Sequence, residues 1–145
     1  MKKVLLMSAV FVLILACSKD KFQTKPQISI KAYSTKALAV GQTMDITFTY
    51  TDKEGDLGNG KFIYYLRRQN IKPADNGAVY PDSVVNTIAP DLPDYDKGDI
   101  NLHFGYFDLK LSNVESDTIL MKFQVVDRAG NRSDTITSDK LVIVQ

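Results

Sequence analysis

Apolar and polar residues alternate with a period of two over most of the chain from residue 28 onward. In residues 44–50 the apolar side chains occupy every second position: Met44, Ile46, Phe48 and Tyr50. This pattern is typical of a strand with one buried face. Residues 99–106 and 117–126 alternate in the same way, and residues 61–69 are apolar on both faces, which indicates a central strand. No segment has a clear apolar repeat of 3.6 residues.

These segments predict an all-β fold with about seven strands. The expected strands are 28–33, 44–50, 61–69, a weak strand at 83–88, 99–106, 117–126 and 138–144. Short strands separated by Gly, Pro, Asp and Asn are typical of an immunoglobulin-like antiparallel β-sandwich. The chain has no Trp and only one Cys, so it lacks the Trp and the inter-sheet disulfide of antibody domains. We therefore expect a bacterial or fibronectin-like variant over residues 28–145.

The first 16 residues have a different pattern. Lys2 and Lys3 precede an apolar run from Val4 to Ala16 that only Ser8 interrupts. This run of 13 residues suits the apolar region of a secretory signal, whereas a membrane-spanning helix needs about 20 residues. We therefore expect residues 1–16 to be an export signal.

The run ends in Leu13-Ile14-Leu15-Ala16-Cys17, which resembles the lipobox of bacterial lipoproteins. The resemblance implies that the signal is removed before Cys17 and that Cys17 receives acyl chains, such as palmitate, that hold the protein on a membrane. The alternative is a plain secretory signal, but Cys17 is the only cysteine and has no intramolecular disulfide partner. Residues 17–27 would then form the lipidated cysteine and a short tether. By analogy with lipoprotein sorting, Ser18 favours the outer membrane of the bacterial envelope, on either its periplasmic or its external side.

Charge and residue content narrow the functional classes. Without Lys2 and Lys3, the remaining 16 basic residues nearly balance the 17 acidic ones, which does not favour a nucleic-acid partner. The only histidine, His103, lies on the polar side of an expected strand. The sequence offers no second base for nucleophilic catalysis and no His or Cys cluster with zinc spacing. We therefore expect a protein that is not an enzyme.

Two loops concentrate oxygen ligands. Asp52, Glu54 and Asp56 lie in the Gly-rich segment 51–60, and Asp127 and Asn131 lie in the polar segment 127–134. In an immunoglobulin-like sandwich these two loops lie at the same end. Carboxylate and carbonyl oxygens are the ligands of Ca²⁺, so the loops together could form a Ca²⁺ site. The alternative is ordinary turn chemistry, in which Arg128 and Arg132 neutralise the acidic loop.

The connection from residue 70 to residue 98 is long and contains four prolines. Loops of this length are often functional, and Tyr80 and Tyr95 are candidate partner contacts within it. The alternative is a meander that covers a sheet edge. Three functions remain open: a binding or assembly module that docks an envelope protein, a glycan-binding module in which tyrosines stack on sugars, and a Ca²⁺-stabilised adhesin-like domain.

Two short segments carry a resemblance to a family. "DKEGDLG" at 52–58 and "VVDRAGNRSDTI" at 125–136 resemble segments of small uncharacterised lipoproteins of the Bacteroidetes type. The resemblance implies one immunoglobulin-like or fibronectin-like domain and a cell-envelope location. It implies no enzymatic activity.

Overall fold

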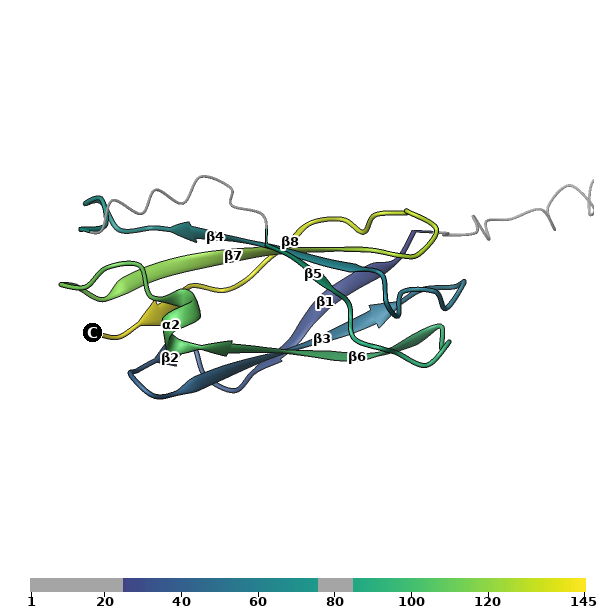
Figure 1. Cartoon of the computed structure of the whole chain (residues 1–145), viewed down its shortest axis with the longest axis horizontal. Coiled ribbons are helices and arrows are strands. Elements are labelled where there is room, and N and C mark those ends of the chain that lie inside the picture. Colours follow the sequence, from purple (N-terminus) through teal and green to yellow (C-terminus); the bar gives the residue numbers. More distant parts are fainter. Residues whose placement is uncertain (1–24, 76–84) are drawn as a thin grey trace, which may run out of the picture.

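The computed structural model describes residues 25–75 and 85–145, which form two packed β-sheets (Figure 1). The smaller sheet has the strand order β1-β3-β6 and consists of β1 (Gln27–Tyr33), β3 (Thr43–Thr51) and β6 (Lys97–Gly105). The larger sheet has the order β2-β9-β7-β4-β5, and β8 pairs with β7 beside this path. Its strands are β2 (Ala37–Leu38), β4 (Lys61–Arg68), β5 (Val85–Ile88), β7 (Asp117–Val126), β8 (Ile136–Thr137) and β9 (Leu141–Ile143). The predicted β-sandwich of two packed sheets is confirmed, although the chain is mostly rather than entirely β.

The predicted strands agree with the observed ones apart from a few differences. The strand expected at 138–144 is reduced to β9, and the two-residue strand β2, which pairs in parallel with β9, has too short a pattern to predict. Tyr106 was expected to end a strand but begins the short helix α2 (Tyr106–Leu109). The reason is local, because the Gly105 amide donates a hydrogen bond of 2.7 Å to the Asp108 carboxylate, which favours a helical turn. Residues 83 and 84 lie outside the described residues.

The core lies between the two sheets and is centred on three phenylalanine rings. Phe48 comes from the smaller sheet, whereas Phe62 and Phe123 come from the larger one, and all three are fully buried. The Phe48 ring centroid lies 4.8 Å from that of Phe123 and 5.3 Å from that of Phe62, both in edge-to-face orientation. This cluster joins the sheets without a disulfide. The alternation predicted in β3 and β7 is confirmed, because the inward-facing residues of both strands are buried.

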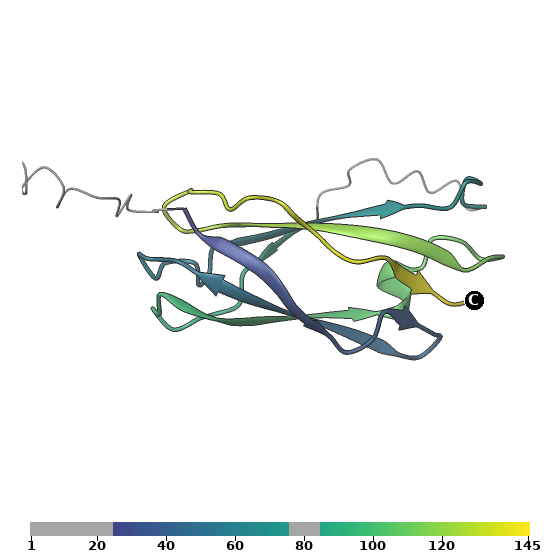
Figure 2. The same cartoon turned by 180° about the vertical axis from the view of Figure 1, so that it is seen from behind.

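The two ends of the sandwich differ in what they carry. Gln27, the first residue of β1, pairs with Thr51, the last residue of β3, so the chain enters the sandwich beside the loop that follows β3. We call this the entry end, and it includes residues 52–60, 89–96 and 127–135. The opposite, distal end carries α2 and the C-terminus (Figures 1 and 2). Among the described residues, no helix has the length and apolar character needed to cross a bilayer.

Candidate metal centre at the entry end

Three loops meet at the entry end and are joined by hydrogen bonds. The Asp52 amide donates to the Asp96 carbonyl oxygen over 2.7 Å, which connects the acidic loop 52–60 to the loop before β6. The Arg128 amide donates to the Asp56 carbonyl oxygen over 3.1 Å, which connects the acidic loop to the loop after β7. The acidic loop therefore lies between two neighbours that hold its backbone in place.

Two glycines allow this close packing. A Cβ atom at Gly60 would lie 2.3 Å from the carbonyl oxygen of Val126, and one at Gly58 would lie 2.7 Å from the carbonyl oxygen of Leu92. Both obstacles are backbone atoms, which a side-chain rotation cannot move. Glycine at these positions therefore lets the acidic loop approach both neighbouring loops.

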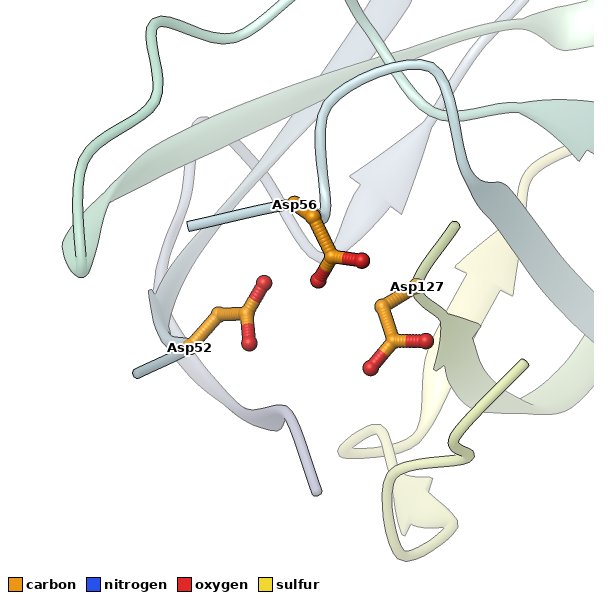
Figure 3. A group of neighbouring side chains, drawn as sticks. All are labelled: Asp52, Asp56 and Asp127. Carbon is orange, nitrogen blue, oxygen red and sulfur yellow. The ribbon is translucent and has the colours of Figure 1, made fainter. Parts of the chain in front are cut away.

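The side chains of Asp52, Asp56 and Asp127 point toward one another (Figure 3). One carboxylate oxygen from each residue lies within 4.8 Å of the other two. Asp52 and Asp56 belong to the loop after β3, and Asp127 follows β7 directly. The expectation that these two loops lie at the same end is confirmed. We call these three residues the carboxylate cluster.

The members of the carboxylate cluster differ in their hydrogen bonds. Asp52 is only 1% exposed, and neither of its carboxylate oxygens has a hydrogen-bond partner. Asp56 Oδ1 is also buried without a partner, whereas Asp56 Oδ2 accepts from the Ala129 amide over 3.1 Å. Both oxygens of Asp127 accept from Asn131, one from the backbone amide (2.8 Å) and one from the side-chain amide (2.9 Å). Asp52 is therefore the least satisfied member.

Burial raises the pKa of Asp52 above its ordinary value, and the negative charges of Asp56 and Asp127 raise it further. The backbone amides of Asp56 and Leu57 act in the opposite direction. Neither amide reaches hydrogen-bonding geometry with the carboxylate, so their influence is the weaker one. The surroundings of Asp52 thus disfavour its charged form as long as no cation is nearby.

A second aspartate, Asp117, is equally buried but fully satisfied. It is also 1% exposed, and its Oδ1 accepts from the Arg68 guanidinium. Its Oδ2 accepts from the amides of Leu111 (2.9 Å) and Ser112 (2.7 Å). Asp117 therefore has a cation and two hydrogen-bonded amides, whereas Asp52 has no cation and only nearby amides that do not reach hydrogen-bonding geometry.

The remaining residues of the predicted site lie outside the carboxylate cluster. Glu54 is exposed, and Asn131 contacts the cluster through Asp127. The guanidinium groups that were expected to neutralise the acidic loop contact other residues. Arg128 pairs with Asp94 at 3.4 Å, and Arg132 donates to the side chain of Gln124 at 3.4 Å.

The other predicted functional residues are dispersed. Tyr95 is exposed at the entry end, in the loop before β6. Cys17, the expected lipidation site, and Tyr80 lie outside the described residues. His103 is exposed on β6 and pairs with Asp45. Asp45 lies seven residues before Asp52, which corresponds to about 23 Å along an extended strand at about 3.3 Å per residue. Because His103 contacts Asp45, it is distant from the carboxylate cluster.

An open groove of about 510 Å³ lies on the outer face of β4 and β5. Ile63, Tyr65, Ile88 and Arg132 are among the residues that line it. The sequence pattern indicated apolar residues on both faces of 61–69, but it did not indicate that Tyr65 would line a groove. The reason is that the groove depends on the pairing of β4 with β5 and on the path of the loop that carries Arg132.

No protein-family model matches the chain, and no curated protein matches it at a significant level.

Proposed function

We propose that this protein is a membrane-anchored cell-envelope lipoprotein with an immunoglobulin-like domain that acts as a non-catalytic binding or assembly module. The strand order supports the fold assignment. The sheet β1-β3-β6 facing β2-β9-β7-β4-β5 corresponds to strands A-B-E facing A′-G-F-C-C′ of immunoglobulin-like domains. In this assignment the weak strand β5 is C′ rather than D, because it pairs with β4.

The observation that carries the binding proposal is a group of exposed apolar side chains at the distal end. Large apolar residues on four separate segments are mostly exposed there: Val40, Ile71, Phe107 and Val114. Hydrogen bonds connect these segments in pairs. The Tyr106 amide donates to the Gln42 carbonyl oxygen (3.2 Å), and the Asn70 side chain donates to the Ser116 carbonyl oxygen (2.9 Å).

Single exposed apolar residues are common on protein surfaces, whereas contiguous apolar patches mark contact surfaces, and the hydrogen bonds that join these segments in pairs support such a patch here. The orientation of the domain supports this use. A lipid on Cys17, with a tether that ends where β1 begins at Gln27, would keep the entry end within about 35 Å of the membrane. The distal end would then point away from the membrane, toward a partner. The expected partner is another envelope protein with an apolar contact surface.

Site-specific photocrosslinking in living cells tests this proposal. A photoreactive amino acid at Phe107 should give one discrete adduct, and the same group at Tyr95, the partner contact predicted from the sequence, distinguishes the distal surface from the entry end. The adduct should disappear when Ile71→Asp is added, because a charge would replace an exposed apolar contact. Equal crosslinking from positions 107 and 95, or no adduct from position 107, would contradict the proposal.

The groove on β4 and β5 favours one second candidate, a glycan-binding module. Tyr65 is half-buried in this groove beside polar side chains, including Asn86 and Arg132. A half-buried aromatic ring next to hydrogen-bonding groups is a suitable surface for a sugar. A glycan array with the purified protein tests this candidate. A signal that Tyr65→Ala removes would support it, and an array without a signal would exclude it for the glycans tested.

A further inference from the structure

We propose that Asp52, Asp56 and Asp127 bind a calcium ion that joins the acidic loop 52–60 to the loop after β7. This site lies at the entry end, so it is separate from the distal surface proposed for the partner. The proposal goes beyond the binding function and does not depend on it.

The first reason is the state of Asp52. Its two carboxylate oxygens and Asp56 Oδ1 are buried and without hydrogen-bond partners. Buried carboxylates in folded proteins are usually paired with a cation, hydrogen-bonded or bound to a metal. Asp117 follows this rule through Arg68 and two amides, whereas Asp52 lacks both kinds of partner. A cation between the three carboxylates would provide the missing partner.

The second reason is the spacing of the oxygens. Two oxygens bound to one Ca²⁺ at about 2.4 Å can be at most about 4.8 Å apart. One oxygen from each of Asp52, Asp56 and Asp127 already meets this limit. Each pair of these oxygens is therefore close enough to share one Ca²⁺, and binding all three would draw the carboxylates slightly closer together.

The third reason is the type of ligand. The cluster offers only carboxylate oxygens, which suit hard cations, and no sulfur or imidazole nitrogen, which would favour zinc or copper. The cluster supplies one oxygen from each of its three residues, and the second oxygen of Asp52, which also lacks a hydrogen-bond partner, would be a fourth ligand if Asp52 bound in a bidentate way. Ca²⁺ takes six to eight oxygens, and water would complete the shell.

Two neighbouring residues hold the proposed ligands in position. Asn131 donates to both oxygens of Asp127, and Ala129 donates to Asp56 Oδ2. A carboxylate oxygen has more than one lone pair, so Asp127 can accept these hydrogen bonds and still bind a cation. Because Asn131 and Ala129 both belong to the loop after β7, the ion would connect this loop to the one after β3. The expected Kd is on the order of 10⁻⁴–10⁻³ M, as in extracellular Ca²⁺ modules.

Thermal unfolding of the full chain in detergent tests the site. We compare EDTA, Ca²⁺, Mg²⁺ and NaCl of equal ionic strength. With a Kd of about 10⁻⁴ M, Ca²⁺ at about 10 mM should raise the Tm by roughly 10 °C over EDTA. Mg²⁺ should give less than half of this rise, because it needs a smaller and more regular shell. Asp52→Asn and Asp127→Asn should lose the rise, whereas Glu54→Gln, an exposed residue of the same loop, should keep it.

Terbium provides a second readout, because Tb³⁺ occupies Ca²⁺ sites and emits when a nearby tyrosine transfers energy to it. The chain has no Trp, and Tyr50 is a buried residue two positions before Asp52. Tyrosine-excited Tb³⁺ emission should rise on binding and fall on addition of Ca²⁺. Tyr50→Phe should reduce the emission and leave the Ca²⁺-dependent Tm rise in place.

Three results would overturn the site: an unchanged wild-type Tm in Ca²⁺, an equal rise in Asp52→Asn, or an equal rise with Mg²⁺. A Ca²⁺-dependent rise together with failed crosslinking at Phe107 would instead contradict only the proposed partner surface. The two proposals therefore fail separately.

Discussion

Removing the negative charge from two equally buried aspartates should change stability in opposite directions. Asp52 and Asp117 are each 1% exposed, but only Asp117 has partners. In EDTA we therefore expect Asp52→Asn to raise the free energy of unfolding and Asp117→Asn to lower it. The comparison isolates the effect of the partners, because the substitution and the burial are the same.

The size of the Asp52 effect follows from the geometry of the cluster. Two negative charges no more than 4.8 Å apart repel each other by at least about 3.5 kcal/mol at an effective dielectric constant of about 20. Asp52 takes part in two such pairs, with Asp56 and Asp127. Protonation of Asp52 limits this cost, so the expected gain from Asp52→Asn at neutral pH is about 1–3 kcal/mol.

The size of the Asp117 effect follows from its partner. The Arg68 side chain is only 9% exposed and would lose its most buried acceptor charge, although Glu115 still contacts it. Removing one partner of a buried ion pair lowers the free energy of unfolding by about 3–5 kcal/mol. Because Arg68 keeps its contact with Glu115, we expect a loss near the lower end of this range. Asp117→Asn should therefore lower the Tm by roughly 10 °C.

Urea unfolding followed by circular dichroism at neutral pH in EDTA measures both effects. Glu54→Gln is the control, and its stability should stay within about 0.5 kcal/mol of the wild type. If Asp52→Asn destabilised the metal-free protein as strongly as Asp117→Asn does, Asp52 would have a stabilising partner and the reasoning would be wrong.

Three further predictions concern pH, the core and the anchor. In EDTA, the free energy of unfolding should fall as the pH rises from about 4 through the raised pKa of Asp52. The reason is that Asp52 loses its proton at a lower pH in the unfolded chain than in the folded protein. Asp52→Asn should remove this part of the pH profile. Phe123→Ala should lower the free energy of unfolding by about 3–5 kcal/mol, because it removes one ring of the fully buried cluster; a loss under 1 kcal/mol in urea titration would contradict that packing. Cys17→Ala should move the protein from the membrane pellet to the soluble fraction, and continued sedimentation with membranes would exclude Cys17 as the anchor.

The sequence alone was sufficient for the long strands and for the position of the acidic loops. Residues 44–50 and 117–126 alternate strictly, and one buried face per strand is the direct consequence of a two-residue repeat. Strands of that kind must pair and stack, so the sandwich and the proximity of the loops after β3 and β7 could be predicted. The sequence pattern gave no indication of α2 or β2, because each contains four residues or fewer.

Only the tertiary structure decided which carboxylates meet and which remain without partners. Asp52, Glu54 and Asp56 are equivalent in sequence spacing, but Gly55 has a φ of 67°, so a strand-like alternation of side chains does not apply in this loop. Whether Arg128 pairs with Asp94 or with the acidic loop depends on the path of the loop before β6. Burial of Asp52 depends on three loops that are far apart in sequence. The local sequence pattern determines where the strands form, whereas the environment of a charged side chain depends on how the whole fold packs.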